Sequence, residues 1–276
     1  DVYKRQGLQF ALKTYEKYDA NPDPYPKSTY YGPKSIQRVT IDNVNGKAFD
    51  PTATYAVVTN NFVAGGGDTY YAFAAATDQF DTGLPLDEVV MEYITKELKG
   101  VIGKQYAEPQ GRILMNPFKD VKTSAWYGSY VIDLYNDGII NGTSATTYAP
   151  NDTLTWAAAH KLLLVSHGDL KAADATGADW SKNTIAKAAE LGLVAADLDG
   201  AKAISRLEFC QVAAKLNKLA ESKTESKFTD CTDGYVMALV DAKVISGMTE
   251  TTFEPAASLT RAQIAKIIYQ LNLIEK

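Results

Sequence analysis

The chain has 276 residues, of which 46% are hydrophobic and 22% charged, and its formal net charge is −5 at pH 7. These values are typical of a globular protein with room for two domains. A negative net charge is not the basic footprint of a protein that binds a nucleic-acid polymer. No apolar run reaches the roughly eighteen residues that a membrane span needs. We therefore expect neither a nucleic-acid partner nor a transmembrane segment.

The first six residues, "DVYKRQ", contain no initiator Met and no apolar signal segment. Read back into codons, they match a transposon end that is used to fragment DNA for sequencing. We expect residues 1–6 to be translated adapter, and we exclude them from the fold prediction. The absence of a signal peptide from this stretch then says nothing about export.

Residues 7–113 carry mixed signals for strands and helices. "SIQRVTIDNV" and "TYAVVTNNFVA" predict strands, with an Asn-Gly turn between them. Residues 84–98 predict a helix, because apolar side chains recur there at helical spacing. Between these elements lies "TNNFVAGGGDTYYAF", whose three glycines allow positive φ and close approach of the backbone to a ligand. Taken alone, this stretch is better explained by a plain turn, with Phe62 in the core and Asp68 as a turn residue.

The order of these elements resembles the C-terminal domain of the 5′-nucleotidase / 2′,3′-cyclic phosphodiesterase family over residues 7–113. The most specific part is the Asn-Phe-x-x-x-Gly-Gly-Asp pattern that begins at Asn61. The resemblance implies that Phe62 stacks on a nucleoside base and that Asp68 accepts hydrogen bonds from the ribose hydroxyls. Gly66 and Gly67 would let the backbone come close. It also implies an N-terminal metallophosphatase domain that holds two divalent metal ions.

The chain itself contains no recognisable catalytic group. Two-metal hydrolysis of a phosphoester needs a cluster of His, Asp and Asn ligands around ions about 4 Å apart. The chain has two histidines. Neither His160 nor His167 stands in the Asp-x-His or Gly-Asn-His-Glu setting that the resembled family uses. We expect both on a helix surface or partly buried, no metal ion or other cofactor in this chain, and no activity from this chain alone.

The second half of the chain contains an internal repeat. "DGIINGTSATTYAPNDTLTWAAAHKLLL" (137–164) aligns without a gap with "AKVISGMTETTFEPAASLTRAQIAKIIY" (242–269), and residues 188–216 form a shorter copy. Each copy predicts a helix, a loop and a second helix. Apolar residues in the second helices form one face, which Ser166 interrupts in the first copy. Because a single helical hairpin cannot bury such a face, we expect the three copies to pack together.

Capping residues predict where the second helices begin. Ser205 with Glu208, and Thr260 with Gln263, form capping boxes. Thr155 keeps the cap in the first copy but has Ala158 where the box needs Glu or Gln.

These repeats resemble S-layer homology (SLH) modules, which open with Phe-x-Asp and start their second helix with Thr-Arg-Ala-Glu. The resemblance divides residues 116–273 into modules at 116–168, 169–220 and 225–273. It implies a pseudo-threefold prism of helices that binds pyruvylated secondary cell-wall polysaccharide in the grooves between copies. A guanidinium suits the ketal carboxylate, and aromatic rings suit sugar faces. The contact residues expected from motif position are Arg206, Arg261, Trp126 and Trp180.

The first and second copies depart from the SLH pattern. Trp156 replaces the motif arginine in the first copy, and the second copy lacks a clear Phe-x-Asp opening. We therefore expect fewer than three competent grooves. The alternative for Arg206 and Arg261 is that they are ordinary surface residues. We favour a binding role, because the dipole at a helix start disfavours a cation there.

The sequence thus predicts an α+β protein, with a mixed α/β nucleoside-binding domain followed by an all-α array of helical hairpins. We expect the C-terminal part of a secreted, cell-wall-anchored 5′-nucleotidase-type metallophosphoesterase. One alternative is a non-enzymatic S-layer or adhesion protein with a structural first domain. Another is hydrolysis of cyclic phosphodiesters or nucleotide sugars. Cys210 and Cys231 could pair, but we favour independent thiols, one of them buried on a helix.

Overall fold

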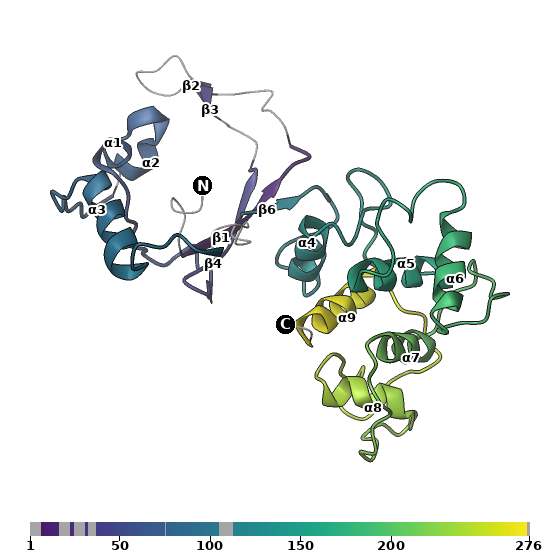
Figure 1. Cartoon of the computed structure of the whole chain (residues 1–276). Coiled ribbons are helices and arrows are strands. Elements are labelled where there is room, and N and C mark those ends of the chain that lie inside the picture. The colour runs from purple at the N-terminus through teal and green to yellow at the C-terminus, as the bar shows by residue number, and fades with distance from the viewer. Residues whose placement is uncertain are drawn as a thin grey trace. The chain divides into compact units, whose positions relative to one another are not determined.

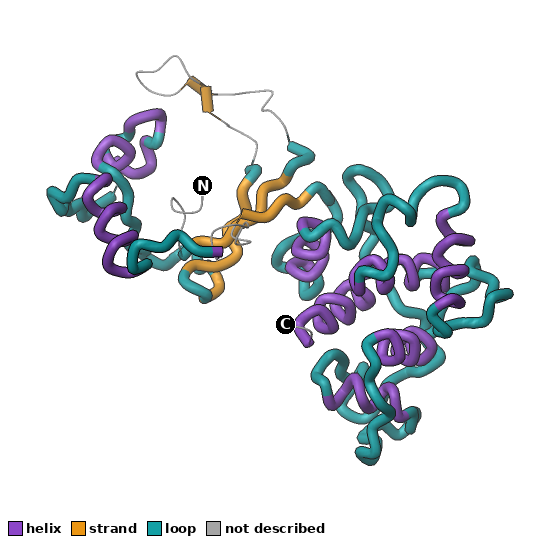
Figure 2. The backbone as a smooth tube through the Cα atoms, viewed as in Figure 1, coloured by secondary structure: helices purple, strands orange, loops and turns teal. Residues whose placement is uncertain are grey.

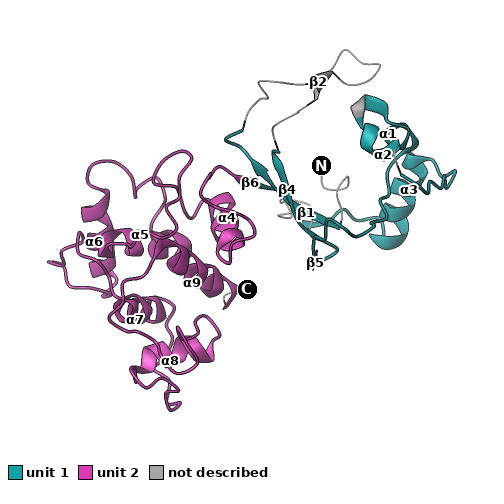
Figure 3. Cartoon of the chain, turned by 180° about the vertical axis from the view of Figure 1, so that it is seen from behind, with its two compact units in different colours: residues 1–115 teal, residues 116–276 magenta. Residues whose placement is uncertain are grey.

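The computed structural model describes residues 7–16, 23–24, 31–32, 37–74, 76–104 and 113–274. The chain divides into two compact units, residues 1–115 and 116–276 (Figure 3). Strands and short helices make up the regular structure of the first unit, and the second unit is largely helical (Figure 2). The predicted α+β class is confirmed. The adapter prediction for residues 1–6 lies outside the described residues.

The first unit contains a four-stranded sheet of order β5-β4-β1-β6 (Figure 1). β1 pairs antiparallel with β4, with a bulge between Gln9 and Phe10. Phe10 and Ala11 are the buried residues of β1. The strands are β1 (Leu8–Lys13), β4 (Val39–Val44), β5 (Lys47–Ala48) and β6 (Ile113–Asn116), with a separate antiparallel pair β2 (Asp23–Pro24) and β3 (Tyr31–Gly32).

The predicted Asn-Gly turn is confirmed. Asn45 (φ 51°) and Gly46 (φ 74°) connect β4 to β5 with both residues in the left-handed region, as a tight hairpin turn requires. The strand predicted from "TYAVVTNNFVA" is wrong. Residues 55–60 form no strand, and residues 61–64 are helical. A strand exists only with a hydrogen-bonded neighbour, and no described strand pairs with this stretch.

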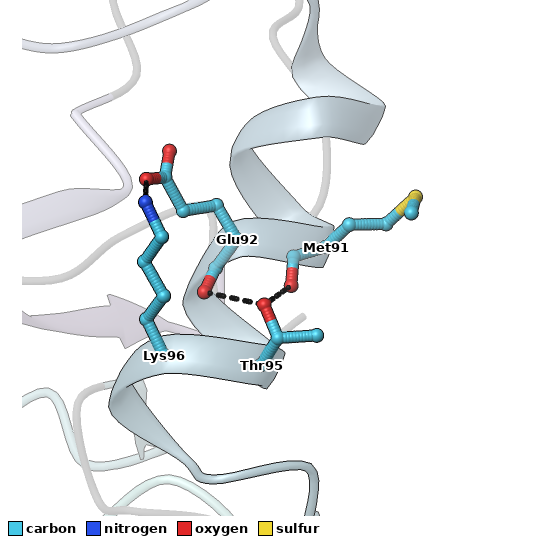
Figure 4. Close-up of polar contacts among 4 residues, drawn as sticks. All are labelled: Met91, Glu92, Thr95 and Lys96. Atoms are coloured by element: carbon cyan, nitrogen blue, oxygen red, sulfur yellow. Dashed lines mark hydrogen bonds and ion pairs between the residues drawn. The ribbon is translucent and has the colours of Figure 1, made fainter.

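Short helices lie between β5 and β6 in the chain. They are α1 (Asn61–Ala64), the 3₁₀ turn η1 (Gly67–Thr69), α2 (Tyr71–Ala74), α3 (Leu86–Glu92) and the π-helical turn η2 (Tyr93–Glu97). The helix predicted over 84–98 is therefore confirmed. Thr95 Oγ1 donates to Met91 O at 2.8 Å and lies 3.2 Å from Glu92 O, while Lys96 pairs with Glu92 (Figure 4). Such back-bonding by a threonine hydroxyl commonly accompanies a distortion of the helix.

The apolar face predicted on this helix remains largely uncovered by described residues. Val89 and Val90 of α3 are 42% and 49% exposed, and Met91 is 64% exposed. The apolar periodicity therefore predicted the helix correctly, but it did not place the helix in a core.

The second unit consists of three helical hairpins, as the repeat predicts. The helices are α4 (Gly128–Asn136), α5 (Trp156–His167), α6 (Trp180–Glu190), α7 (Arg206–Leu216), α8 (Gly234–Asp241) and α9 (Arg261–Ile274). Ser205 and Glu208 form the predicted capping box, and Thr260 forms one with Gln263. Thr155 caps α5 without a box partner, because its side chain accepts a hydrogen bond from Ala158 N at 3.3 Å but Ala158 has no group to return one.

Backbone hydrogen bonds join the three repeats into a closed ring. At the start of each second helix, two consecutive amides donate to the loop of the next repeat, and the third repeat returns to the first. The same pattern in all three copies confirms the predicted pseudo-threefold packing. The bonds are Trp156 N to Lys202 O (2.9 Å), Ala157 N to Gly200 O (3.0 Å), Arg206 N to Ala257 O (2.8 Å), Leu207 N to Pro255 O (3.0 Å), Arg261 N to Asp152 O (2.9 Å) and Ala262 N to Pro150 O (3.0 Å).

The residues next to these caps form the centre of the ring. Leu154, Ile204 and Leu259 occupy equivalent positions, and each is at most 4% exposed. Leu154 N donates to Leu259 O, and Ile204 N donates to Leu154 O. Burial of these side chains stabilises the ring by removing apolar surface from water.

Candidate functional sites

The glycine-rich stretch of the first unit forms one tight turn. Gly66 has φ 87°, and Asp68 has φ 49° and ψ 35°, so both lie in the left-handed region. A Cβ on Gly67 would lie 2.6 Å from Phe62 Cζ and 2.6 Å from Phe62 O. Because no side chain fits in that space, Gly67 allows the Phe62 ring to lie directly against the backbone of the turn.

The turn presents an aromatic ring and a carboxylate to solvent. Phe62 is 58% exposed and Asp68 is also exposed. Asn60 caps α1 by accepting from Val63 N at 2.8 Å, which fixes the helix that carries Phe62. The four residues singled out in the sequence therefore lie together. A non-glycine residue held at positive φ costs energy, and such residues are concentrated at functional sites.

The two motif arginines make different contacts across the repeat interfaces. Arg261 is half-buried and extends from the third repeat to the first. Its Nε donates to Tyr148 O at 2.7 Å and its Nη2 to Asn141 O at 2.9 Å. Its guanidinium carbon lies 4.4 Å from the centroid of the Tyr148 ring. Burial raises the pKa of Tyr148 to about 12, so this ring carries no charge at neutral pH.

Arg206 makes the equivalent contact from the second repeat to the third, but it is only 8% exposed. Its guanidinium carbon lies 4.9 Å from the centroid of the Phe253 ring, and its Nη2 donates to Ser246 O at 3.3 Å. Burial lowers its pKa, and its buried Nε has no hydrogen-bond partner among the described residues. Neither arginine is a plain surface residue.

The third interface, from the first repeat to the second, has Trp156 at the arginine position. The Trp156 ring stacks on His160 at 5.4 Å, with an angle of 20° between the ring planes. In the second repeat, Leu198 stands where Tyr148 and Phe253 stand in the other two. The arginine and its aromatic partner are thus replaced together at this interface.

Of the predicted tryptophans, Trp180 begins α6 and Trp126 lies just before α4. Trp126 is 56% exposed and contacts Tyr127 edge-on at 5.4 Å. Trp180 is half-buried, and Lys161 Nζ lies 5.3 Å from its ring centroid. The structure therefore brings Trp180 next to a cation of the first repeat.

With this geometry in place, family comparisons give the chain its classification. The model of the 5′-nucleotidase C-terminal domain matches residues 7–75, and that of the S-layer homology domain matches residues 117–159 and 229–265. The chain is a 5′-nucleotidase C-terminal domain followed by SLH domains. The second repeat lies outside the two matched SLH segments.

Three curated relatives match part of this sequence. The Endoglucanase of Bacillus sp. (strain KSM-635) is 30% identical over 56% of this chain and 18% of its own length. The Surface-layer 125 kDa protein of Lysinibacillus sphaericus is 40% identical over 28% of this chain and 7% of its own length. The Amylopullulanase of Thermoanaerobacterium thermosulfurigenes is 27% identical over 58% of this chain and 10% of its own length. The chain spans less than a fifth of each relative's length.

The SLH domains indicate a location at the cell surface, associated with the S-layer. Within the described residues, no helix is both long and apolar enough to cross a membrane. In that same part of the chain, no group of three or more His, Cys, Asp or Glu side chains could hold a metal ion.

Two aspartates of the SLH domains have a role that the sequence alone did not reveal. Asp120 accepts hydrogen bonds from Tyr148 N at 2.9 Å and Ala149 N at 2.7 Å. Asp230 does the same for Phe253 N and Glu254 N, both at 2.8 Å, and these bonds lower its pKa. The aspartate of each Phe-x-Asp opening therefore orients the loop whose aromatic ring receives the arginine. The Phe-x-Asp motif is the sequence feature that could have indicated this role of the two aspartates.

The prediction for one histidine is wrong. His160 is fully buried, and its ring stacks on that of Trp156 one turn earlier in α5. Burial lowers its pKa, so it is uncharged at neutral pH. His167 is half-buried and pairs with Asp169 at 2.6 Å. Cys210 and Cys231 are both buried, free thiols.

Proposed function

We propose that the chain is the C-terminal part of a cell-surface-anchored 5′-nucleotidase-type metallophosphoesterase. In this proposal residues 7–113 bind the nucleoside part of a nucleotide, and the SLH repeats bind cell-wall polysaccharide that carries pyruvyl groups. The two divalent metal ions and the hydrolytic residues belong to a preceding domain. The observation that carries the proposal is the turn in which Gly67 holds the exposed Phe62 ring beside Asp68.

The chemistry of this turn suits a nucleoside. An exposed phenyl ring can stack on a base, and such a stack contributes about 1–3 kcal/mol. A carboxylate can accept charge-assisted hydrogen bonds from two ribose hydroxyls. The family match over residues 7–75 includes all four residues of the turn.

A titration of the full chain with adenosine, uridine and glucose tests this part. We expect the nucleosides to bind weakly and glucose not to bind. Phe62→Ala and Asp68→Asn should each weaken nucleoside binding, whereas Phe80→Ala should leave it unchanged. Phe80 is a matched control, since it is 88% exposed and lies outside the turn. Equal losses from Phe62→Ala and Phe80→Ala would reject the turn as the site.

The second candidate is a non-enzymatic surface-layer protein whose first domain is structural. The match to the Surface-layer 125 kDa protein favours it. A chain that binds no nucleoside but still sediments with cell walls would support this candidate. The wall-binding part is tested by sedimentation with walls that carry pyruvyl groups and with walls stripped of them. Equal sedimentation with both would reject pyruvyl recognition.

A further inference from the structure

Met248 brings an exposed thioether into contact with a buried cation. It lies in the loop that follows α8 in the third repeat, and its side chain is 46% exposed. Its Sδ lies 3.1 Å from Nη1 of Arg206, which belongs to the second repeat and is only 8% exposed. The Met248 side chain therefore joins two repeats while solvent can still reach it.

A second N–H group faces the same sulfur. The Oε1 of Gln263 accepts a hydrogen bond from Thr260 N at 2.9 Å in the capping box of α9, and this bond orients the side-chain amide. Its Nε2 lies 4.0 Å from Met248 Sδ, which is a long contact even for sulfur. Because a thioether is a weak acceptor, both donors are poorly satisfied by it.

The other nitrogens of Arg206 are also poorly satisfied. Its Nη2 donates to Ser246 O at 3.3 Å, and its buried Nε has no hydrogen-bond partner among the described residues. A buried charged group with weak partners costs free energy. An oxygen atom attached to the sulfur of Met248 would offer this guanidinium a strong acceptor.

The equivalent interface between the third and first repeats lacks this arrangement. In the ungapped alignment of the repeats, Thr143 stands in the place of Met248. The Thr143 hydroxyl donates to Thr147 O at 3.2 Å. The arginine of that interface, Arg261, donates to two backbone carbonyls at 2.7 and 2.9 Å. The thioether thus accompanies the arginine that has the poorer partners.

We propose that Met248 is an oxidation site whose sulfoxide is held by Arg206 and Gln263, so that oxidation strengthens the interface between the second and third repeats. The oxidant is a hydroperoxide such as hydrogen peroxide. A lone pair of the sulfur attacks one peroxide oxygen, and the O–O bond breaks as the S–O bond forms. The departing hydroxide takes the proton of the transferred oxygen and leaves as water. Sulfur loses two electrons, and the peroxide gains them.

The position of Met248 suits a sulfoxide. In a core, a sulfoxide disrupts packing because it turns an apolar side chain into a polar one. Met248 is instead exposed, and its three rotatable side-chain bonds let the sulfur move to make room for the oxygen. That oxygen can then accept a charge-assisted hydrogen bond from Arg206. The SLH domains indicate a cell-surface location, which lies outside the reducing cytosol.

Mild treatment of the full chain with hydrogen peroxide tests the proposal. Peptide mapping by mass spectrometry should find one added oxygen atom on Met248 and none on Met237, which is 4% exposed. After the peroxide is removed, tryptophan fluorescence follows unfolding of the second unit, because all three tryptophans lie there. The oxidised parent should unfold about 2–4 °C above the reduced parent, the shift expected for one stronger hydrogen bond.

Four variants locate the effect of oxidation. Met248→Leu should abolish the shift, whereas Met91→Leu should keep it, since Met91 is a 64% exposed methionine of the first unit. Arg206→Ala removes the main donor and should also abolish the shift. Gln263→Glu keeps the acceptor of the capping box but removes the N–H group, so the shift should become smaller. This last variant tests the contact even if Arg206→Ala fails to fold.

Three results would overturn the proposal. The first is an unmodified Met248 at a peroxide dose that fully oxidises Met91. The second is an oxidised parent that unfolds at the same temperature as the reduced parent or below it. The third is a full shift in Met248→Leu, which would assign the effect to another methionine. Because no polysaccharide or nucleoside is present, failure of the proposed function would leave these results unchanged.

Discussion

Arg206 and Arg261 stand at the same motif position, yet their surroundings give them different roles. Arg206 is only 8% exposed, whereas Arg261 remains half-buried. Each guanidinium lies over an aromatic ring of the next repeat, which is an attractive arrangement. The second repeat thus uses its arginine for packing, while the arginine of the third can still contact a ligand.

Replacing Arg206 by alanine should lower the free energy of unfolding by about 1–3 kcal/mol, because it truncates a buried side chain. Arg206→Met should cost less, since Met retains the length of the buried stem and removes the unpaired Nε. Urea unfolding of both variants measures this, with Arg261→Ala as the comparison. Equal costs for Arg206→Ala and Arg261→Ala would contradict the assignment of Arg206 to the core.

Cys210 and Cys231 should react slowly with a thiol reagent at pH 8 in the native protein. Burial raises the pKa of Cys210 to about 12 and also raises that of Cys231, and the thiolate is the reactive form. Labelling with a chromogenic disulfide should therefore be slow for both thiols until guanidinium unfolds the chain. Fast native labelling of Cys210 would show that α7 opens on its own.

At the scale of elements, the interface between the first and second repeats is built around Trp156. From the motif alone, an arginine at this position would restore the pattern. In the structure the Trp156 ring stacks on His160. The second repeat has Leu198, which is not aromatic, at the position of Tyr148 and Phe253. A guanidinium placed here would lack the ring that Arg206 and Arg261 have.

We therefore expect Trp156→Arg to lower the melting temperature and to leave wall binding no stronger. Adding Leu198→Phe should recover part of the stability, because it supplies the missing ring. Thermal unfolding of the single and double variants measures this coupling as a double-mutant cycle. Tighter wall binding by the single variant would show that the motif arginine suffices without its aromatic partner.

The sequence predicted the helices and caps of the second unit well, because these depend on local spacing. Ser205 and Glu208 lie three residues apart and form their box without help from the rest of the chain. The strand predicted near residues 54–64 failed because a strand depends on a distant partner. The contacts of Arg261 with Tyr148 were equally beyond prediction, since 113 residues separate them.

At the scale of the whole molecule, the two units differ in how well their described side chains are covered. Residues 55–102 include Val58, which is fully exposed, and Phe80, which is 88% exposed. In contrast, α5, α7 and α9 contribute many buried apolar residues. Regions with few buried contacts open most readily.

Brief digestion with chymotrypsin should therefore cut first within residues 37–104 and leave a resistant fragment that contains residues 116–274. Mass spectrometry of the products locates the cuts, and Phe80 is an expected site because of its exposure. Early cleavage within α5, α7 or α9 would contradict the assignment of these helices to the stable core of the SLH repeats.

The closure of the ring has a consequence for how the protein matures at the cell surface. Arg261 N donates to Asp152 O, so the first repeat obtains its last backbone partner from the final helix, α9. During N-terminal-first synthesis and export, the first two repeats emerge with that edge still open. A chain cut short before α9 would lack both the closure and Arg261. If the SLH repeats bind the wall as proposed, copies truncated before α9 should be released rather than retained.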